Sequence, residues 1–287
     1  MINKLILKLI NSNSVVGKLF RKFTLINLKL KASVRIFNKF YNKLSFEDKA
    51  VIHSIFAKYY RTGDKKIAAD NWEIIFNENK ILIPLSKKRL WLDWDSALSV
   101  VGHDIYVKKT YEYLLNNIQI NCFFDVGANY CTHSLLFLRN NISTYSFEPN
   151  IICSEYFEDC LEINNLKGNF INMAIGNEKG QVELTFPEND TWLGTISAKE
   201  NDFVSKFENL TKVKVEINTL DNYSKINNLQ PELIKIDTEG FEIEVLKGAS
   251  EILQTIQPII ILEANDIDKR GELYAFLDKS SYGIFNL

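Results

Sequence analysis

The chain has 287 residues, 46% hydrophobic and 24% charged, which suffices for one sizeable core plus an accessory region and excludes a wholly disordered chain. Its net charge of −2 hides an asymmetry, because residues 1–45 hold ten Lys/Arg and no acid, whereas the remainder carries 24 basic and 36 acidic residues. This balance indicates a membrane surface or a polyanion as partner of the basic head, and it argues against a nucleic-acid groove in the acidic body.

The cysteine and histidine content argues against a zinc site and for a reduced, cytoplasmic chain. None of the four cysteines forms a CxxC pair, and only three histidines are present. No apolar run reaches about 18 residues, so no transmembrane helix is expected. The first residues lack a small-residue cleavage site, so no signal peptide is expected either.

Residues 1–65 are predicted to form a basic helical extension. Apolar residues recur at spacings of three and four with Lys and Arg between them, and "NSNS" at residues 11–14 interrupts the pattern. Two interpretations stay open. Residues 1–45 form either an amphipathic anchor, peripheral at the inner membrane face, or a helical cap packed on the main domain with a solvated basic rim.

Residues 66–118 predict a leader made of a hairpin and a helix. Residues 81–94, "ILIPLSKKRLWLDW", alternate on both sides of "SKK", as the two strands of a hairpin do. Residues 104–117 have the spacing of a helix and lead into the third region.

Residues 119–287 alternate short apolar strands with helices, a rhythm typical of an α/β domain with a mostly parallel sheet and helices on both faces. Strands are expected at residues 121–126, 143–148, 169–175, 181–186, 212–218, 232–237, 258–263 and 282–286. Helices are expected at residues 132–140, 152–164, 241–256 and 268–278. No helix separates the fourth and fifth strands, which predicts an added antiparallel element.

The stretch "FFDVGANYCTHSLLFLRNN", residues 123–141, predicts a ligand loop. Its strand ends near Asp125, and Gly127 would let the backbone approach a ligand. The following helix would point free N–H groups at that ligand. In open α/β sheets, ligands lie beyond the carboxyl ends of the strands, where this loop is expected.

Two other predicted strands end in acids at the same edge. Glu148, in "YSFEPN", follows Gly127 by 21 residues, and a carboxylate at that place accepts both hydroxyls of a ribose. Asp237 ends the strand of "LIKIDTEG". Three strand ends are therefore expected to form the walls of one site.

A dinucleotide site also has a glycine loop followed by an acid about 20 residues later. Two details argue against it here. The GxGxxG pattern is absent after Gly127, and Asp125 would repel a pyrophosphate. Asp125 suits a cationic ligand instead, and S-adenosylmethionine carries an ammonium and a sulfonium but no phosphate.

The segments "DVGAN", "FEPN", "IKIDTEGFEIEVLKGA" and "IIILEAN", in this order and spacing, resemble the FkbM family of S-adenosylmethionine-dependent methyltransferases. The resemblance covers about residues 120–287, and its most specific part is "KIDTEGFEIEVLKGA". It implies a class I, Rossmann-like fold. It also implies methyl transfer to a hydroxyl of a sugar or another small molecule, as in glycan or natural-product biosynthesis.

Residues of the three strand ends are the candidates for the site. Those expected to bind S-adenosylmethionine are Asp125, Gly127, Ala128, Asn129, Cys131, Glu148 and Ala174. Those expected to act in catalysis are Asp237, Glu239 and His133. No metal site is expected, although Asp237, Glu239 and Glu263 offer an oxygen set that a divalent ion would accept.

The roles of the catalytic candidates stay open. Asp237 either acts as base for an acceptor hydroxyl, orients the acceptor, or only bonds the amides of the following turn. His133, one residue into its helix, either approaches the acceptor or faces solvent. His103 is a candidate for a lid, and Trp192 for contact with a sugar ring.

Cys131 departs from the family pattern, which has glycine at that position. A cysteine with positive φ would cost about 1 kcal/mol, and with negative φ it would only add bulk near the methionine end of the cofactor. Cofactor binding is expected to persist in either case. The alternatives to an enzyme of this kind are an inactive Rossmann-like scaffold and a nicotinamide-dependent oxidoreductase.

Overall fold

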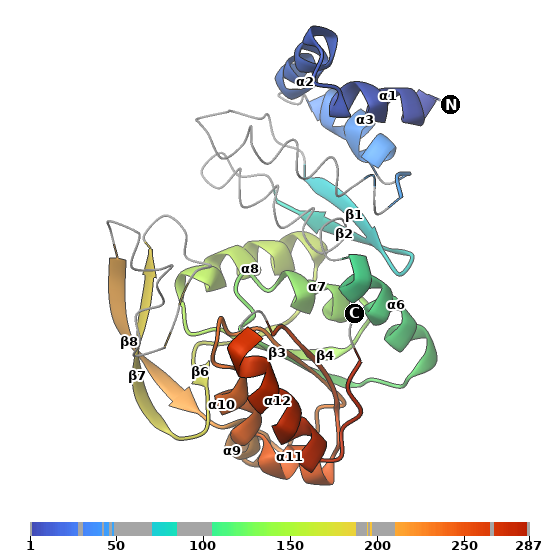
Figure 1. Ribbon diagram of the computed structural model, residues 1–287. Helices are drawn as coiled ribbons and strands as arrows, with labels where there is room; N and C mark the ends of the chain where they lie inside the picture. Colours follow the sequence, from blue (N-terminus) through green and yellow to red (C-terminus); the bar gives the residue numbers. More distant parts are fainter. Residues whose placement is uncertain are drawn as a thin grey trace. The chain divides into compact units, whose positions relative to one another are not determined.

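The computed structural model of the chain describes residues 2–27, 31–41, 43–45, 48, 71–84, 105–187, 194, 196, 210–264 and 267–285. The chain divides into two compact units, residues 1–118 with 162–165, and residues 119–161 with 166–287 (Figure 1). The boundary expected between residues 65 and 66 lies outside the described residues and stays a prediction. In the described part of the chain, no helix is both long and apolar enough to traverse a bilayer.

Four helices of the first unit lie in the described part of the chain, three of them near its start. They are α1 (Ile2–Asn11), α2 (Val15–Asn27), α3 (Lys31–Tyr41) and α6 (Ile105–Asn117). The predicted break at "NSNS" is confirmed, because α1 ends and α2 begins on its two sides. Ser14 promotes the second start, since its hydroxyl accepts the N–H of Gly17 at 3.1 Å.

The first unit also contains a hairpin that the sequence did not predict. Strands β1 (Trp72–Phe76) and β2 (Asn79–Ile83) pair antiparallel, so β2, the first strand of the predicted hairpin, has the preceding strand as a partner. Asn77 and Glu78 both have positive φ, as the two central residues of a tight hairpin turn require. The second half of the predicted hairpin lies outside the described residues.

The second unit is an α/β domain around a five-stranded sheet. Its strands are β3 (Cys122–Val126), β4 (Ser143–Phe147), β5 (Asn169–Ile171), β9 (Leu233–Ile236) and β10 (Ile259–Leu262). They lie in the order β10-β9-β3-β4-β5, and every neighbouring pair is parallel. The predicted fold class is therefore confirmed.

Helices cover both faces of this sheet (Figure 1). On one side lie α7 (Thr132–Arg139) and α8 (Ile152–Asn164). On the other lie α9 (Leu220–Asn227), α10 (Glu242–Lys247), α11 (Ser250–Thr255) and α12 (Ile267–Lys279). Helix α9 was not predicted, and its start is capped by the Thr219 hydroxyl, which accepts the N–H of Asn222. Residues 241–256, predicted as one helix, form α10 and α11.

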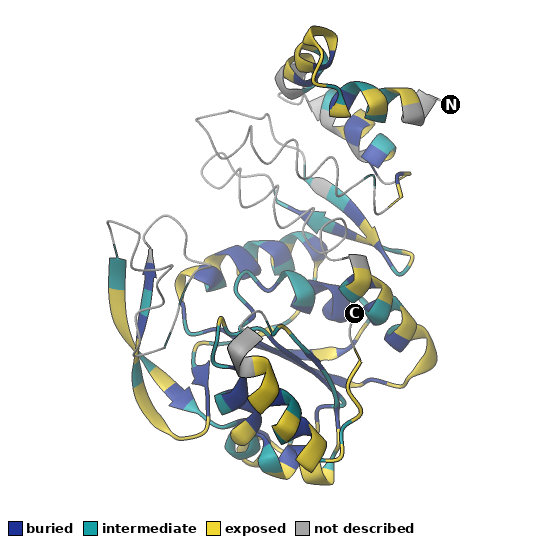
Figure 2. Ribbon diagram, viewed as in Figure 1, coloured by how far each residue is buried: buried dark blue, intermediate teal, exposed yellow. Residues whose placement is uncertain are grey.

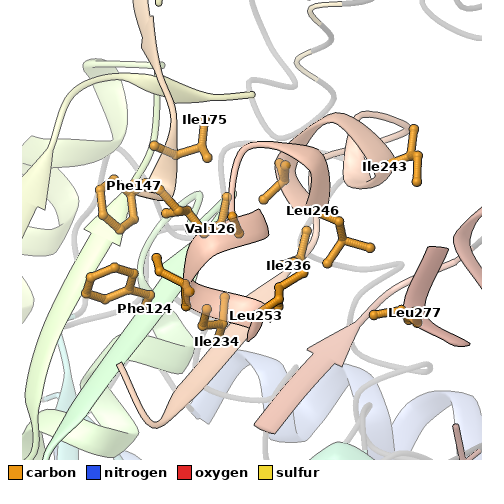
Figure 3. Close-up of a cluster of buried hydrophobic side chains, with 14 of the residues drawn as sticks. Phe124, Val126, Phe147, Ile175, Ile234, Ile236, Ile243, Leu246, Leu253 and Leu277 are labelled. Carbon is orange, nitrogen blue, oxygen red and sulfur yellow. The ribbon is translucent and has the colours of Figure 1, made fainter. Parts of the chain in front are cut away.

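The alternation of side chains along each strand divides the core between these faces. Phe124, Val126, Ile234 and Ile236 belong to one cluster that also takes its members from α9 to α12 (Figure 3). Phe123 points to the opposite face, where its ring centroid lies 4.0 Å from that of Phe137 in α7. In Figure 2 the strands of the sheet are mostly buried, whereas the helices have exposed outer sides.

A second, three-stranded sheet adjoins the carboxyl edge. Strand β8 (Leu210–Asn218) pairs parallel with β6 (Ala174–Ile175) and antiparallel with β7 (Gly180–Pro187). The predicted antiparallel element is confirmed. The strand expected at 169–175 is instead divided between the two sheets, with Asn172 and Met173 as the link.

The strand expected at residues 282–286 is wrong for its described part. Residues 282–285 pair with no strand, and α12 ends in a turn in which the N–H of Tyr282 donates to the carbonyl of Leu277 at 3.0 Å. Ser281 takes the positive φ that this turn needs. The apolar pattern of "YGIFNL" therefore does not indicate a strand, and Phe285 is exposed.

Candidate active site at the carboxyl edge of the parallel sheet

Gly127 lies where the ends of β3 and β9 are in close contact. Its φ is +72°, and a Cβ built on it would lie 1.8 Å from the carbonyl oxygen of Asp237. Its N–H and that of Ala128 both donate to the carbonyl of Phe147, at 3.0 and 3.1 Å. Glycine is thus required by the junction of the strands, which fixes the loop that borders the site.

Glu148, the first residue after β4, is held in place by both carboxylate oxygens. Oε2 accepts the N–H of Asn129 and Oε1 accepts the N–H of Asn150, each at 2.8 Å. Burial raises the pKa of Glu148 to about 7, although these two N–H donors lower it. Each oxygen keeps a further lone pair, so the carboxylate is oriented and still able to accept a hydrogen bond from a ligand.

Asp125 does not reach the surface of the site, contrary to the expected contact with the cofactor. Its side chain is fully buried, and Oδ2 accepts the hydroxyl of Ser134 at 2.6 Å. Oδ1 lies 3.5 Å from Nζ of Lys235. The reason is strand parity, because Asp125 has the same parity as Phe123 and therefore points beneath α7.

The partners of Asp125 form a polar row across three strands under α7. Strand register places Asp125 beside Ser146 of β4 and Lys235 of β9. The Ser134 hydroxyl lies 2.7 Å from that of Ser146, so the row continues into the helix. Lys235 also lies 3.2 Å from Oδ2 of Asp237, and the row thereby connects the buried acid to the mouth of the site.

Lys235 and Asp237 stabilise each other in the charged form. Burial lowers the pKa of Lys235, but Asp237 and Asp125 outweigh it, so the pKa lies above the ordinary value for lysine. Burial likewise raises the pKa of Asp237, but Lys235 and a hydrogen bond with Glu263 outweigh it, so the pKa lies below the ordinary value for aspartate. Asp237 is thus an ionised carboxylate at neutral pH.

The turn after Asp237 is organised by Glu242, a residue that the sequence analysis did not single out. Its Oε1 accepts the N–H and the hydroxyl of Thr238, at 3.1 and 3.0 Å, and the N–H of Gly240 at 2.9 Å. Glu239 takes a positive φ of 53° at the tip of this turn. Burial and the charges of Asp237 and Glu242 raise the pKa of Glu239.

His133 is half-buried and lies near the charges of the polar row. Burial and the charge of Lys235 lower its pKa to about 4, against Asp125 and Asp237, which raise it. The ring is therefore neutral at pH 7. His133 is not among the residues that line the hollow described below, so the structure brings it to the row but not to the site surface.

Cys131 adopts the strained alternative of the two that the sequence left open. It is the N-cap of α7 with φ 57° and ψ 29°, and its side chain is fully buried. The thiol donates a weak hydrogen bond to the carbonyl of Asn129 at 3.6 Å. The other alternative, a negative φ with side-chain bulk near a cofactor, does not apply, and Cys131 does not line the hollow described below.

A hollow of about 220 Å³ lies beyond the ends of β3, β4 and β9. Its apolar lining includes Phe147, Met173, Ala174, Ile175, Leu184, Ile196 and Phe241. The charged residues of its lining are Glu148, Asp237 and Glu239, and no Lys, Arg or His contributes to the lining in the described part of the chain. Of the residues expected to bind a cofactor, Gly127, Asn129, Glu148 and Ala174 line this hollow, whereas Asp125, Ala128 and Cys131 are buried and do not line it.

Two other candidate residues and the metal site remain to be placed. His103 and Trp192 lie outside the described residues. Within the described ranges, no group of three His, Cys, Asp or Glu side chains is arranged to hold a metal ion.

The chain resembles several known methyltransferases. It is 26% identical over 139 residues to the hexuronic acid methyltransferase AglP of Haloferax volcanii, and this match covers 48% of the chain and 54% of AglP. The chain thus spans about half the length of this curated relative.

Among solved structures, the methyltransferase FkbM of Methylobacillus flagellatus is similar with a TM-score of 0.41 at 14% identity, over 67% of this chain and 48% of that chain. A SAM-dependent methyltransferase of Agrobacterium tumefaciens is similar with a TM-score of 0.41 at 8% identity, over 79% and 67% of the two chains. The model of the methyltransferase FkbM domain matches residues 125–283, more than half of the chain, and includes every strand end that borders the hollow. The chain therefore belongs to the methyltransferase FkbM domain family.

Proposed function

We propose that this protein transfers the methyl group of S-adenosylmethionine to a hydroxyl of a sugar or a similar small molecule. The observation that carries this proposal is the charge of the hollow, whose described lining holds three carboxylates and no cationic side chain. S-Adenosylmethionine supplies a methyl group on a sulfonium and has a cationic ammonium, so an acidic lining attracts it. A dinucleotide would place its pyrophosphate against the same carboxylates.

Glu148 would bind the ribose hydroxyls. Its two oxygens are already oriented by the N–H groups of Asn129 and Asn150, so it loses little freedom when it accepts hydrogen bonds from a ligand. Met173, Ala174 and Ile175 also line the hollow and offer an apolar wall to an adenine ring. Gly127 and Asn129 belong to the same lining.

Asp237 would orient the acceptor. Lys235 holds its carboxylate ionised, and a carboxylate of low pKa is a weak base but a good acceptor for the hydrogen bond of a hydroxyl. Methyl transfer from a sulfonium is an in-line displacement, which gains much of its rate from correct placement of the acceptor oxygen. Glu239, at the rim with a raised pKa, is the better candidate for accepting the hydroxyl proton.

The name of AglP supports a sugar acceptor. That relative is a hexuronic acid methyltransferase, and its match to this chain is modest in identity and coverage. A carboxylated sugar would meet the acidic lining at Asp237 and Glu239, so we expect a hydroxyl remote from any sugar carboxylate to face them.

Isothermal titration of the full chain with S-adenosylmethionine tests the proposal. Wild type is expected to bind, and Glu148→Gln to bind at least about tenfold more weakly, because one charged hydrogen-bond acceptor is lost. Glu183→Gln, an exposed glutamate on β7, is the matched control and should bind like wild type. Absence of binding by wild type, with an intact circular dichroism spectrum, would support an inactive scaffold, and a fluorescence change with NADH would support an oxidoreductase.

Methyl transfer is tested with labelled S-adenosylmethionine and a set of oligosaccharides ending in glucuronic acid, galacturonic acid or a neutral hexose. Asp237→Asn is expected to keep cofactor binding and to lose at least about 100-fold in transfer rate, as for a group that places the acceptor. Equal rates for Asp237→Asn and wild type would show that Asp237 only shapes its turn.

A further inference from the structure

Helix α2 carries apolar side chains on its solvent side. Val15, Val16, Leu19 and Phe23 have 73%, 63%, 61% and 66% of their surface exposed. Their spacing places all four within one stripe of the helix. Figure 2 shows exposed residues over much of α2. We call these four residues the α2 stripe.

The stripe faces outward because the opposite side of α2 is fixed to the end of α1. Arg21 is 7% exposed and donates from Nη1 to the carbonyls of Ile10 and Ser12, at 2.6 and 2.7 Å. A Cβ on Gly17 would lie 2.2 Å from the carbonyl of Ser12, so the two backbones are in close contact there. Turning the stripe inward would therefore break a buried, charged pair of hydrogen bonds.

Cations lie along one edge of the stripe. Lys18 and Lys22, on the same helix, are exposed, and so are Arg35 and Lys39, which neighbour the exposed Ile36 in α3. Residues 1–45 contain ten Lys/Arg and no acid, so no carboxylate within this segment neutralises them. An apolar stripe bordered by cations has the chemistry of a helix that lies in the headgroup region of an anionic bilayer.

We propose that the α2 stripe, with Lys18 and Lys22, binds the surface of an anionic membrane. The apolar side chains enter the boundary between headgroups and acyl chains, while the lysines contact lipid phosphates and carboxylates. A second copy of this chain fits less well, because it would bring two basic surfaces together. The hollow of the second unit is not part of this surface, so the inference does not depend on the proposed enzyme activity.

Sedimentation of the full chain with vesicles tests this. Vesicles of phosphatidylcholine with about 30% phosphatidylserine are compared with vesicles of pure phosphatidylcholine. Each cation near the anionic surface increases the binding constant by roughly a factor of five. Wild type is expected to partition at least about tenfold more strongly onto the anionic vesicles, and to lose most of this preference in about 0.5 M salt.

Leu19→Asp with Phe23→Asp is expected to weaken binding by roughly 100-fold, since two apolar side chains are lost and two negative charges are gained. Ile226→Asp is the matched control, because Ile226 is 71% exposed on α9 in the other unit, and it should bind like wild type. Lys18→Glu with Lys22→Glu should abolish the preference for anionic vesicles. All these sites are exposed, so circular dichroism should show an unchanged fold.

Three outcomes would overturn the proposal. Wild type would fail to sediment with anionic vesicles, the stripe variant would bind as tightly as wild type, or Ile226→Asp would weaken binding equally. A wild type that does not bind vesicles but forms a dimer, which the stripe variant dissociates, would identify the stripe as a contact between copies instead.

Discussion

Replacing Lys235 by methionine tests whether one buried cation holds the site together. Methionine keeps most of the apolar stem of the lysine but removes the charge, which lies 3.5 Å from Asp125 and 3.2 Å from Asp237. Asp125 is fully buried, and its one remaining hydrogen bond would come from Ser134. Removing one partner of a buried ion pair costs about 3–5 kcal/mol, so Lys235→Met should lower the free energy of unfolding by about that amount.

A second substitution separates charge from packing. Asp125→Asn removes the carboxylate that Lys235→Met leaves unpaired, so the double variant should recover most of the loss and lie within about 2 kcal/mol of wild type. Lys212→Met is the matched control, because Lys212 pairs with Glu183 at 2.9 Å while both side chains are 55% exposed. An exposed pair of this kind contributes at most about 1 kcal/mol.

Urea unfolding followed by tryptophan fluorescence measures these differences at neutral and acid pH. Lys235 lowers the folded-state pKa of Asp237, against burial, which raises it. The resulting stability is fully present above the unfolded-state pKa of about 4 and is lost as the pH falls through the folded-state pKa. The difference in the free energy of unfolding between wild type and Lys235→Met should therefore become smaller below about pH 4. Equal losses for Lys235→Met and Lys212→Met, or no recovery in the double variant, would refute the reasoning.

Three further predictions concern the loop and Glu148. Gly127→Ala should lower the free energy of unfolding by about 3 kcal/mol or more. Its Cβ would lie 1.8 Å from a backbone carbonyl oxygen, and residue 127 has a positive φ that strains an alanine. Gly271→Ala, with nothing within 4 Å of the new Cβ in α12, should stabilise by about 1 kcal/mol, and urea unfolding compares the two. Burial raises the pKa of Glu148 to about 7, so ionisation of this carboxyl lowers the free energy of unfolding as the pH rises from about 4.5 to 7. Binding of S-adenosylmethionine should weaken as the pH falls through 7 in wild type, because the carboxylate becomes protonated, but not in Glu148→Gln. Titration calorimetry measures both affinities. Cys131→Gly should relieve about 1 kcal/mol of backbone strain but lose somewhat more stability through lost buried contacts. The affinity for S-adenosylmethionine should stay within about threefold of wild type, and a tenfold gain in this affinity would contradict the prediction.

The local pattern predicted most elements of the second unit because each has a strong periodicity of its own. Residues 152–164 form α8 as expected, and the strands around 122–126 and 143–147 follow their apolar runs. Elements that depend on capping were harder. α9 begins on Thr219 and has few apolar residues, and the hairpin of the first unit turns on Asn77 and Glu78, a weaker signal than Asn-Gly.

The sequence predicted those site residues whose position follows from the pattern of a single strand. Glu148 and Asp237 follow apolar strands, which indicated their place at the carboxyl edge. The contacts of Asp125 cannot be predicted without the strand order. Only the register of β3 with β4 and β9 brings Asp125 beside Ser146 and Lys235. Period two alone places Asp125 on the same face as Phe123, beneath a helix.

The polar row keeps one ionised carboxylate in the site without placing a cation in its lining. Of the three carboxylates that line the hollow, Asp237 is held ionised by Lys235, whereas burial raises the pKa of Glu148 and of Glu239. Lys235 supplies the cation from behind, 6% exposed, so it neutralises the buried Asp125 and holds Asp237 ionised without entering the lining. A lysine within the lining would also lower the pKa of Asp237, but it would repel a sulfonium. The position of Lys235 on the covered face of β9 therefore matters as much as its charge, because it separates the electrostatics that stabilise the fold from those that face the ligand.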